Sequence, residues 1–340
     1  MFALIDKNLY HTSVPYLKEY LVTSGTVKNA NFDRLIDEVI EKVGDRQFVL
    51  LPEKYLSRSN SPTIKYILAK KLLRKRKLSE ARTILTSNIE KDHPMRPFAS
   101  HLLGMIYSIE RNYVDSINEF KKCVSLSTSA LSDSPSAQRQ RQLIINRDYC
   151  SAGIARAYYA AKDYLNADLA FLDVEKSSLI WPELLFEEAW NSYYKGDYNR
   201  TLGKLVTYRS PVLSYVFNPE VDVLNALSFF QLCLYNDASR VIENYYRKYE
   251  KETRGLGRVV NRRRNDLNYY FNIAVSYTQG KKSDSAIVNS LLDSVLKDPA
   301  FLNLMDSYKR GKGEIDLVRR VGHTPLRKVL TTNLKDSLTL

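Results

Sequence analysis

Histidine is the side chain of this sequence best suited to proton transfer or metal binding, and its copies lie far apart. They are His11, His93, His101 and His323. None belongs to an HExxH motif or to another spacing that would point two imidazoles at one metal ion. The GKGE stretch at 311–314 lacks the spacing and the Lys-Ser/Thr pair of a phosphate-binding loop. We therefore expect no bound metal, nucleotide or other cofactor.

Cysteines and paired carboxylates offer no better candidates for catalysis. Cys123, Cys150 and Cys233 form no CxxC motif, and an odd number of cysteines is not a disulfide framework. We expect three buried or half-buried thiols without chemistry, which fits a reducing compartment and does not exclude a periplasm. Glu187 and Glu188 are adjacent, and neighbours on a helix point about 100° apart, so they cannot share a proton. The sequence predicts a protein that is not an enzyme.

Charge is the most informative bulk property. The 340 residues include 51 Lys and Arg against 38 Asp and Glu, which gives a net charge of +13. This excess favours an acidic protein, an anionic membrane surface or a nucleic acid as the partner. No run of about 18 apolar residues predicts a transmembrane segment, and the first 20 residues lack the features of a signal peptide. Either the protein is cytoplasmic, or a signal segment was removed and Met1 was added by cloning.

Two stretches concentrate the positive charge. The first, KKLLRKRK at 70–77, is interpreted as a solvated helix end with Leu72 and Leu73 buried; a contact with an acidic partner or with anionic lipid is the alternative. The second, KETRGLGRVVNRRRN at 251–265, is expected to be an exposed loop. Neither stretch interleaves aromatic residues as a stacking platform for bases would, so nucleic acid is the less favoured partner.

Apolar residues recur at helical spacing along most of the chain. In PELLFEEAWNSYYKGDYNRTLGKL, at 182–205, Leu185, Ala189 and Tyr193 share one helical face, Gly196 interrupts it, and Tyr198 begins a second face. A small residue in the first helix of such a pair is followed twelve residues later by a small or hydroxyl residue in the second. The pairs are Ala69 and Ala81, Gly104 and Ser116, Ala155 and Ala167, Ala189 and Thr201, Ala226 and Ala238, Ala274 and Ala286.

This recurrence resembles the tetratricopeptide repeat (TPR), a pair of helices about 34 residues long with small residues where the helices touch. The resemblance implies an all-α fold: a TPR-like right-handed helical solenoid of about six helix-turn-helix repeats with atypical flanking helices. The domains are then N-terminal capping helices at 1–61, a TPR solenoid at 62–299, and C-terminal helices at 300–340 that can begin a further region. Inserts fall near 125–147, a Ser-rich loop or helix extension without packing of its own, and near 251–266.

In TPR proteins the first helix of each repeat lines a concave face, and the resemblance assigns a binding surface to this chain. Its residues are Lys70, Arg74, His101, Arg156, Tyr159, Trp190 and Tyr194. We expect a non-catalytic scaffold or adaptor that binds a protein or peptide partner, of unknown identity, along this face. Two other interpretations stay open: the aromatic residues are core, above all Phe186 and Tyr193, or the function is nucleic-acid or anionic-surface binding through the basic loops.

The two repeats at 184–250 further resemble those of uncharacterised envelope TPR proteins from predatory and gliding deltaproteobacteria. That resemblance implies a periplasmic location and a role in a cell-envelope complex. At the end of the chain, Leu326, Leu330, Leu334 and Leu338 recur every four residues after Thr324. They predict a helix that docks on the last repeat or makes an intermolecular contact. An apolar helix at this position also suggests a fragment of a longer protein, and the oligomeric state stays open.

Overall fold

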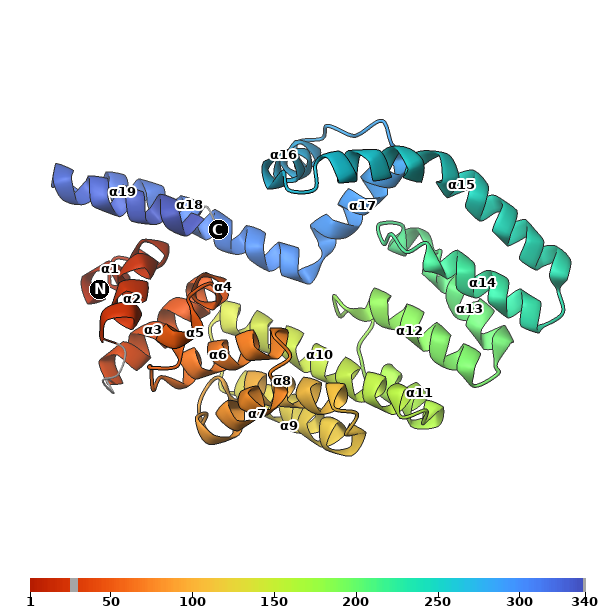
Figure 1. Ribbon diagram of the computed structural model, residues 1–340, viewed down its shortest axis with the longest axis horizontal. Helices are drawn as coiled ribbons and strands as arrows, with labels where there is room; N and C mark the ends of the chain where they lie inside the picture. The colour runs from red at the N-terminus through yellow and green to blue at the C-terminus, as the bar shows by residue number, and fades with distance from the viewer. Residues whose placement is uncertain (25–29, 339–340) are drawn as a thin grey trace. The chain divides into compact units, whose positions relative to one another are not determined.

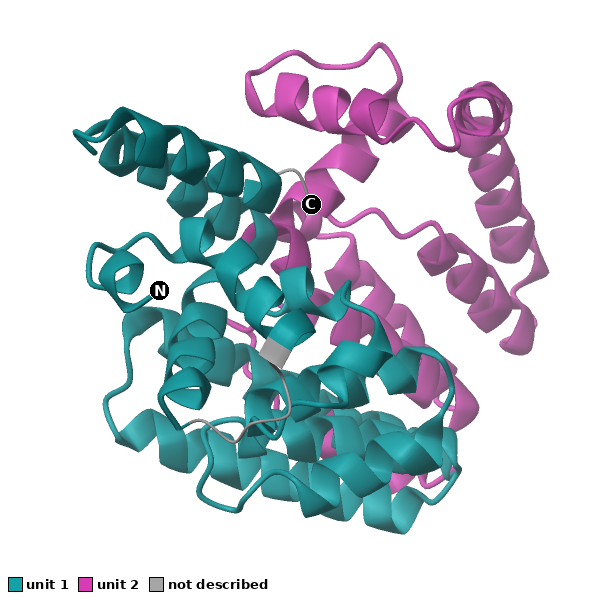
Figure 2. Cartoon of the chain, turned by 60° about the vertical axis from the view of Figure 1, so that its left-hand side comes forward, with its two compact units in different colours: residues 1–161, 303–340 teal, residues 162–302 magenta. Residues whose placement is uncertain are grey.

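The computed structural model describes residues 1–24 and 30–338, and all regular elements in these ranges are helical. The chain forms two compact units, which Figure 2 colours separately. Unit 1 comprises Met1–Ala161 and Asn303–Leu340, and unit 2 comprises Lys162–Leu302. Within the described ranges no helix is long and apolar enough to cross a bilayer.

Unit 1 contains the first ten helices and the last two, labelled in Figure 1. They are α1 (Phe2–Ile5), α2 (Tyr10–Ser24), α3 (Ala30–Val43), α4 (Arg46–Val49), α5 (Glu53–Leu56), α6 (Pro62–Arg74), α7 (Leu78–Ser87), α8 (Arg96–Ile109), α9 (Tyr113–Ser132), α10 (Ala137–Ala160), most of α18 (Pro299–Arg319), and α19 (Thr324–Leu338). Helices α6 and α7 pack as a pair, and so do α8 and α9. The unit therefore has the helix-turn-helix architecture predicted from the repeat pattern.

Small residues allow the helices of unit 1 to approach closely, as the repeat pattern predicted. The ring of Phe120, on α9, lies against Gly104 of α8 and Gly153 of α10. A Cβ atom at either glycine would come within 2.7 Å of that ring. The hydroxyl of Ser116 donates a hydrogen bond of 2.8 Å to the carbonyl of Gly104, its partner in the pattern. These contacts explain why both positions of the pair are small.

The C-terminal helices pack on the start of the chain. Helix α19 lies against α2, and Leu9, Val318, Leu330 and Leu334 form their common core. The predicted C-terminal helix is therefore present, but its leucine face docks on α2 of unit 1 instead of on the last repeat. Sequence periodicity shows that a face is apolar; it does not show which distant surface covers that face.

Unit 2 contains the remaining helices. They are α11 (Tyr164–Leu172), α12 (Trp181–Tyr194), α13 (Tyr198–Tyr208), the short 3-10 helix η1 (Pro211–Leu213), α14 (Glu220–Gln231), α15 (Tyr235–Arg262), α16 (Leu267–Thr278) and α17 (Ala286–Lys297). Gly196 adopts a positive φ of 79° between α12 and α13, and the Asp197 carboxylate then caps α13 by accepting from the Arg200 N–H at 3.0 Å. The Gly-Asp break in the sequence is therefore the turn of a helix pair.

The first predicted insert is the helix extension that the sequence allowed beside a loop, and the second contains more helix than the sequence indicated. Helix α9 continues to Ser132 and α10 begins at Ala137, with Leu143 buried, so the first insert is mainly a packed extension of two helices. The expectation that it lacks packing of its own is wrong. Helix α15 continues to Arg262, so most of the second insert is helical instead of a loop. Pro135 lies in the break between α9 and α10, whereas no proline lies within α9, α10 or α15 themselves. The domain boundaries at 61 and 299 stay a prediction. The two compact units are divided at other positions, after Ala161 and after Leu302.

Candidate partner-binding groove

Unit 1 contains a groove of about 1200 Å³. Its walls come from α3, α6, α8, α10 and α18, so the first helix of each predicted repeat in this unit contributes to it. Lys70 and Arg74 of α6 and His101 of α8 lie along this groove, as do Tyr66 and Met105. The structure thus gathers three of the seven residues that the sequence assigned to a binding surface. Their role in binding stays a prediction.

Several aromatic side chains line the groove. Tyr66 and Phe98 meet edge to face with centroids 6.5 Å apart, and the guanidinium of Arg139 lies 4.7 Å from the centroid of Phe98. His101 stacks on Tyr149 at 6.2 Å. Such a surface offers apolar area together with polar edges, which suits the side chains of a polypeptide. Phe98 and Arg139 were not among the residues singled out from the sequence.

His101 is held in one orientation beside the groove. Its Nδ1 lies 2.9 Å from Oδ1 of Asn146, whose amide nitrogen donates to Sγ of Cys123 and to Oγ of Ser127, each at 3.2 Å. With the amide in this orientation Nδ1–H is the donor. Burial lowers the pKa of His101, although the hydrogen bond to Asn146 opposes this shift. The ring is therefore a neutral hydrogen-bonding group at neutral pH and contributes no positive charge.

Two of the three cysteines form a disulfide, which corrects the expectation of three thiols without chemistry. Cys123 of α9 and Cys150 of α10 are fully buried and bonded, with their Cα atoms 6.2 Å apart. The packing of α9 against α10 brings these positions face to face, and spacing along the chain could not reveal this. Cys233 is a free, exposed thiol, contrary to the prediction that it is at least half-buried.

The groove carries more positive than negative charge. Seven basic and five acidic residues line it. Several of the acids are already engaged: Asp45 pairs with Lys70 at 2.5 Å, and Asp306 pairs with Arg310 and, at 3.3 Å, with Arg141. Arg74, at the end of α6, is exposed and makes no ion pair or hydrogen bond with any residue that the structure describes. The free positive charge of the groove is therefore located at the C-terminal end of α6.

The C-terminal segment contributes one wall of the groove. From α18, Arg310 donates to the carbonyl of Lys42 and Ser307 to the carbonyl of Val43, both at 2.9 Å. Gln138 of α10 also donates to the Lys42 carbonyl, at 3.2 Å. These carbonyls belong to the last turn of α3, where a helix has no partners of its own for them. Helix α18 is thus fastened to α3, and no local sequence signal could have placed it there.

The other predicted surface residues lie elsewhere. Arg156 and Tyr159 are half-buried on α10, outside the groove lining. Trp190 and Tyr194 belong to α12 in unit 2, where Tyr194 stacks between Trp190 at 5.8 Å and Tyr164 at 5.9 Å. We call these three rings the aromatic cluster. The predicted surface is therefore divided between the two units.

The competing core interpretation holds for part of the aromatic stretch of α12. Phe186 is only 8% exposed and packs against Tyr208, whereas Tyr194 is 53% exposed. Trp190 and Tyr193 are half-buried. Phe186 is therefore a core residue, Trp190 and Tyr193 pack against the core while partly exposed, and Tyr194 is the exposed ring of the aromatic cluster.

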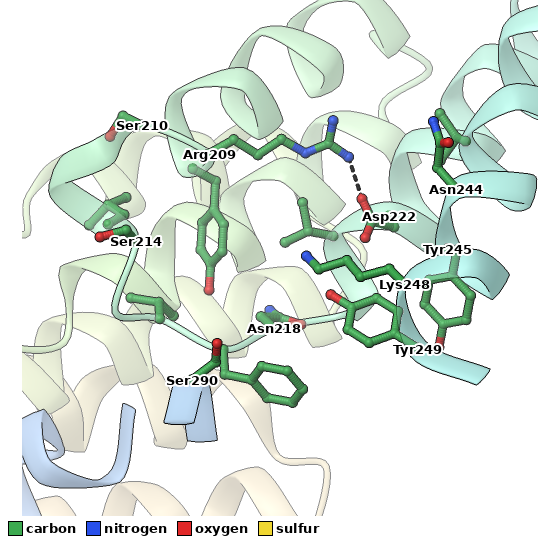
Figure 3. A pocket seen from close by; sticks show the side chains of 16 residues that line it. Arg209, Ser210, Ser214, Asn218, Asp222, Asn244, Tyr245, Lys248, Tyr249 and Ser290 are labelled. Atoms are coloured by element: carbon green, nitrogen blue, oxygen red, sulfur yellow. Dashed lines mark hydrogen bonds and ion pairs between the residues drawn. The ribbon is translucent and has the colours of Figure 1, made fainter. Parts of the chain in front are cut away.

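Unit 2 has two smaller cavities separated by residues 208 and 216–218. The first, about 370 Å³, contains Arg209 paired with Asp222, and Tyr245, Lys248 and Tyr249 of α15 (Figure 3). The second, about 500 Å³, is lined by Trp190 and Phe186 of α12, by residues 215–218 and by the end of α17. Among the described residues no group of three or more His, Cys, Asp or Glu side chains is placed to hold a metal ion.

Comparison with known proteins adds little to this geometry. No protein-family model matches the sequence, and no curated protein matches it. Among solved structures, the TPR-like repeats of a putative kinesin light chain from Podosopora anserina are 13% identical, with a TM-score of 0.42 over 55% of this chain and 93% of that one. The Rap conjugation gene regulator of plasmid pLS20, in complex with the Phr* peptide, is 14% identical, with a TM-score of 0.40 over 98% of this chain and 95% of that one.

The apo form of RapI is 11% identical, with a TM-score of 0.47 over 99% of this chain and 97% of that one. At these TM-scores the likenesses carry no argument about the partner, site or activity of this chain. The TPR-like assignment rests on the helix pairs and their small-residue contacts. The resemblance to deltaproteobacterial envelope proteins stays a prediction.

Proposed function

We propose that this chain is a non-catalytic scaffold or adaptor that binds an extended segment of a protein or peptide in the groove of unit 1. The observation that carries this proposal is the groove itself. It is large, lined by the first helices of successive repeats, and combines an aromatic surface with free positive charge at one end. Repeat solenoids commonly bind partners along such extended concave surfaces.

The charge distribution suggests how a partner lies in the groove. Its apolar side chains contact Tyr66, Phe98 and Met105, and its carboxylates or C-terminus approach Arg74 and Arg76. Because those arginines are exposed, they mainly set the rate and orientation of encounter, whereas buried aromatic contacts provide most of the affinity. Binding is therefore expected to slow at high salt without disappearing.

Peptide display on the immobilised chain tests this proposal. The affinities of selected peptides are then measured by fluorescence anisotropy for the unmodified chain and for the double variant Arg74→Glu and Arg76→Glu. A loss of affinity on the order of tenfold is expected from reversing two charges near a bound carboxylate. Lys121→Glu is the matched control, because Lys121 is exposed on α9 and outside the groove. If a peptide binds the double variant as tightly as it binds the Lys121→Glu control, this groove is not its binding site.

A second candidate function, binding to nucleic acid or another anionic surface, is favoured by one observation on α15. Arg247, Lys251, Arg254, Arg258 and Arg262 are all exposed, and their spacing places them on one side of the helix. Phosphates bound by such a line of cations would release counterions, so the affinity would fall steeply with salt. A duplex-binding titration at several salt concentrations separates this candidate from the groove. Substituting Arg258 and Arg262 by Gln should abolish such binding and leave peptide binding unchanged.

We further propose a periplasmic location in a cell-envelope complex, with a cytoplasmic location as the alternative. The Cys123–Cys150 disulfide supports an oxidising compartment, since disulfides are rare in the cytosol. The experiment is thiol labelling of the native protein in intact source cells, followed by mass spectrometry. Alkylation of both cysteines without prior reduction would contradict the periplasmic location.

A further inference from the structure

The cavity of about 500 Å³ in unit 2 has a local charge opposite to that of the chain. Glu183, Glu187, Glu220 and Asp298 line it, whereas Lys297 is the one basic residue that the described chain places there. The whole chain carries a net charge of +13. A concave site with excess negative charge on a basic protein attracts small cations and repels anions, because a cleft focuses the field of its lining charges.

Aromatic rings form much of the same cavity. Phe186, Trp190, Tyr208 and Tyr215 contribute to the lining. Phe186 meets Trp190 edge to face at 6.4 Å and lies 5.9 Å from Tyr208. The face of an aromatic ring carries partial negative charge, so it attracts an ammonium or guanidinium group, and Trp does so most strongly. Rings and carboxylates here favour the same kind of ligand.

Helix α12 carries the Trp190 ring and two of the four acidic side chains that line the cavity. Glu183, Glu187 and Trp190 are separated by four and three residues on α12, which places them on one face of that helix. The helix is fixed by its core residues Leu185 and Ala189. The arrangement is therefore a property of a packed helix and does not depend on a loop.

The cavity already holds one cation of the chain itself. The Nζ atom of Lys297, at the end of α17, lies 3.9 Å from the ring centroid of Tyr215. An ammonium group of the chain itself therefore already lies over one of the rings that line this cavity. The lining therefore combines one basic with four acidic side chains.

We propose that this cavity binds the cationic group of a partner: an ammonium or guanidinium group seated against Trp190 and faced by Glu183 and Glu187. The source is either a Lys or Arg side chain of a polypeptide or a small quaternary ammonium compound. Because every lining residue belongs to unit 2, this site is independent of the groove proposed for peptide binding in unit 1.

Tryptophan fluorescence provides a direct measurement, because the chain has two tryptophans, Trp181 and Trp190. Trp181→Phe leaves Trp190 as the only reporter. The probes are N-acetyl-lysine methylamide, N-acetyl-arginine methylamide and tetramethylammonium, at constant ionic strength, with the uncharged N-acetyl-norleucine methylamide as control. We expect a saturable change with cationic probes alone. A response to the amino-acid probes indicates a polypeptide source, and a response to tetramethylammonium alone indicates a small quaternary ammonium.

Charge variants complete the test in the same background. The double variant Glu183→Gln and Glu187→Gln should lower the affinity for cations by about tenfold, from loss of two nearby charges. Glu243→Gln, an exposed acid of α15 outside the cavity, is the matched control. Lys297→Met should raise the affinity severalfold, because it frees the Tyr215 ring. Equal responses to charged and uncharged probes, no response to any probe, or unchanged affinity in the double variant would each overturn the proposal.

Discussion

At the scale of single residues, the positions that matter most for the fold are small. Gly104 and Gly153 receive the ring of Phe120, and Ala69, Ala81 and Ala189 are fully buried. The interior of a protein is packed as densely as an organic crystal, so one added methyl group at such a point must displace a neighbour. These positions connect the sequence pattern directly to the distance between helices.

The first prediction concerns the two glycines around Phe120. Gly104→Ala and Gly153→Ala should each lower the free energy of unfolding by roughly 1–3 kcal/mol, because the new Cβ overlaps the ring. Gly203→Ala is the matched control, since nothing lies within 4 Å of a Cβ placed there on α13. Removing a helical glycine at an open position should stabilise by roughly 0.5–1 kcal/mol. Urea denaturation gives all three values, and equal effects at the three sites would be inconsistent with this packing.

The second prediction compares two alanines that the repeat pattern treats as equivalent. Ala189 is fully buried on α12, and the hydroxyl of Thr201 donates to its carbonyl at 3.4 Å, whereas Ala226 on α14 is only half-buried. Ala189→Leu should therefore destabilise by roughly 1–3 kcal/mol through overpacking, and Ala226→Leu by less. Thermal unfolding of both variants measures the difference. If both melt like the parent, the repeat register is wrong.

At the scale of elements, the junction of α2 with α18 and α19 depends on buried polar groups. The Glu314 carboxylate, on α18, accepts hydrogen bonds from the N–H groups of His11 and Thr12 at 2.7 and 2.9 Å and from the Thr12 hydroxyl at 2.8 Å. The carboxylate thereby accepts from backbone N–H groups in the first turn of α2, and such groups have no acceptor within their own helix. Gly311 lets α18 approach His11 and Leu338 closely. This junction makes the end of the chain part of unit 1.

The third prediction is that acid weakens this junction. Burial and the charge of Arg310 lower the pKa of His11 from 6.5 to about 4. The unfolded chain therefore takes up this proton at a higher pH than the folded chain does, so stability is lost as the pH falls from about 6.5 to about 4. The loss from this group amounts to about 3 kcal/mol over that window. Burial raises the pKa of Glu314. The folded chain therefore takes up this proton at a higher pH than the unfolded chain does, so protonation of Glu314 favours the folded chain and opposes the effect of His11.

Comparison with His11→Phe separates the two contributions. The aromatic substitute keeps a ring of similar shape and removes the titrating group, so its unfolding free energy should decline less between pH 6.5 and 4 than that of the unmodified chain. Urea midpoints at half-unit pH steps give both profiles. Parallel profiles would mean that His11 does not control the acid sensitivity of this junction.

At the scale of the whole molecule, three surfaces compete for the role of partner site: the groove of unit 1, the aromatic cluster of unit 2 and the basic side of α15. Trp190→Ala should cost on the order of 2 kcal/mol in partner affinity if the cluster carries the binding energy, because a few Trp and Tyr residues commonly dominate the energy of an interface. Once a partner is found, this variant is compared with the Arg74 and Arg76 double variant and with substitutions at 258–264. The variant that loses affinity while retaining its melting temperature identifies the surface used.

The sequence by itself determined the local architecture of this protein. Helix pairs, their turns and the small residues between them depend on contacts a few residues apart or across one turn, so periodicity and spacing predict them. It also identified Lys70, Arg74 and His101 as neighbours on one side of the repeats, and the structure places them along one groove.

Only the tertiary structure decided the features that join distant parts of the chain. Glu314 accepts a hydrogen bond from the backbone of His11, 303 residues earlier in the first turn of α2, Cys123 bonds to Cys150 across two helices, and α18 supplies a groove wall through Arg310. The acidic aromatic cavity likewise combines α12 with the end of α17. Such contacts depend on which exposed faces meet after the helices have formed, and local propensity does not encode that choice.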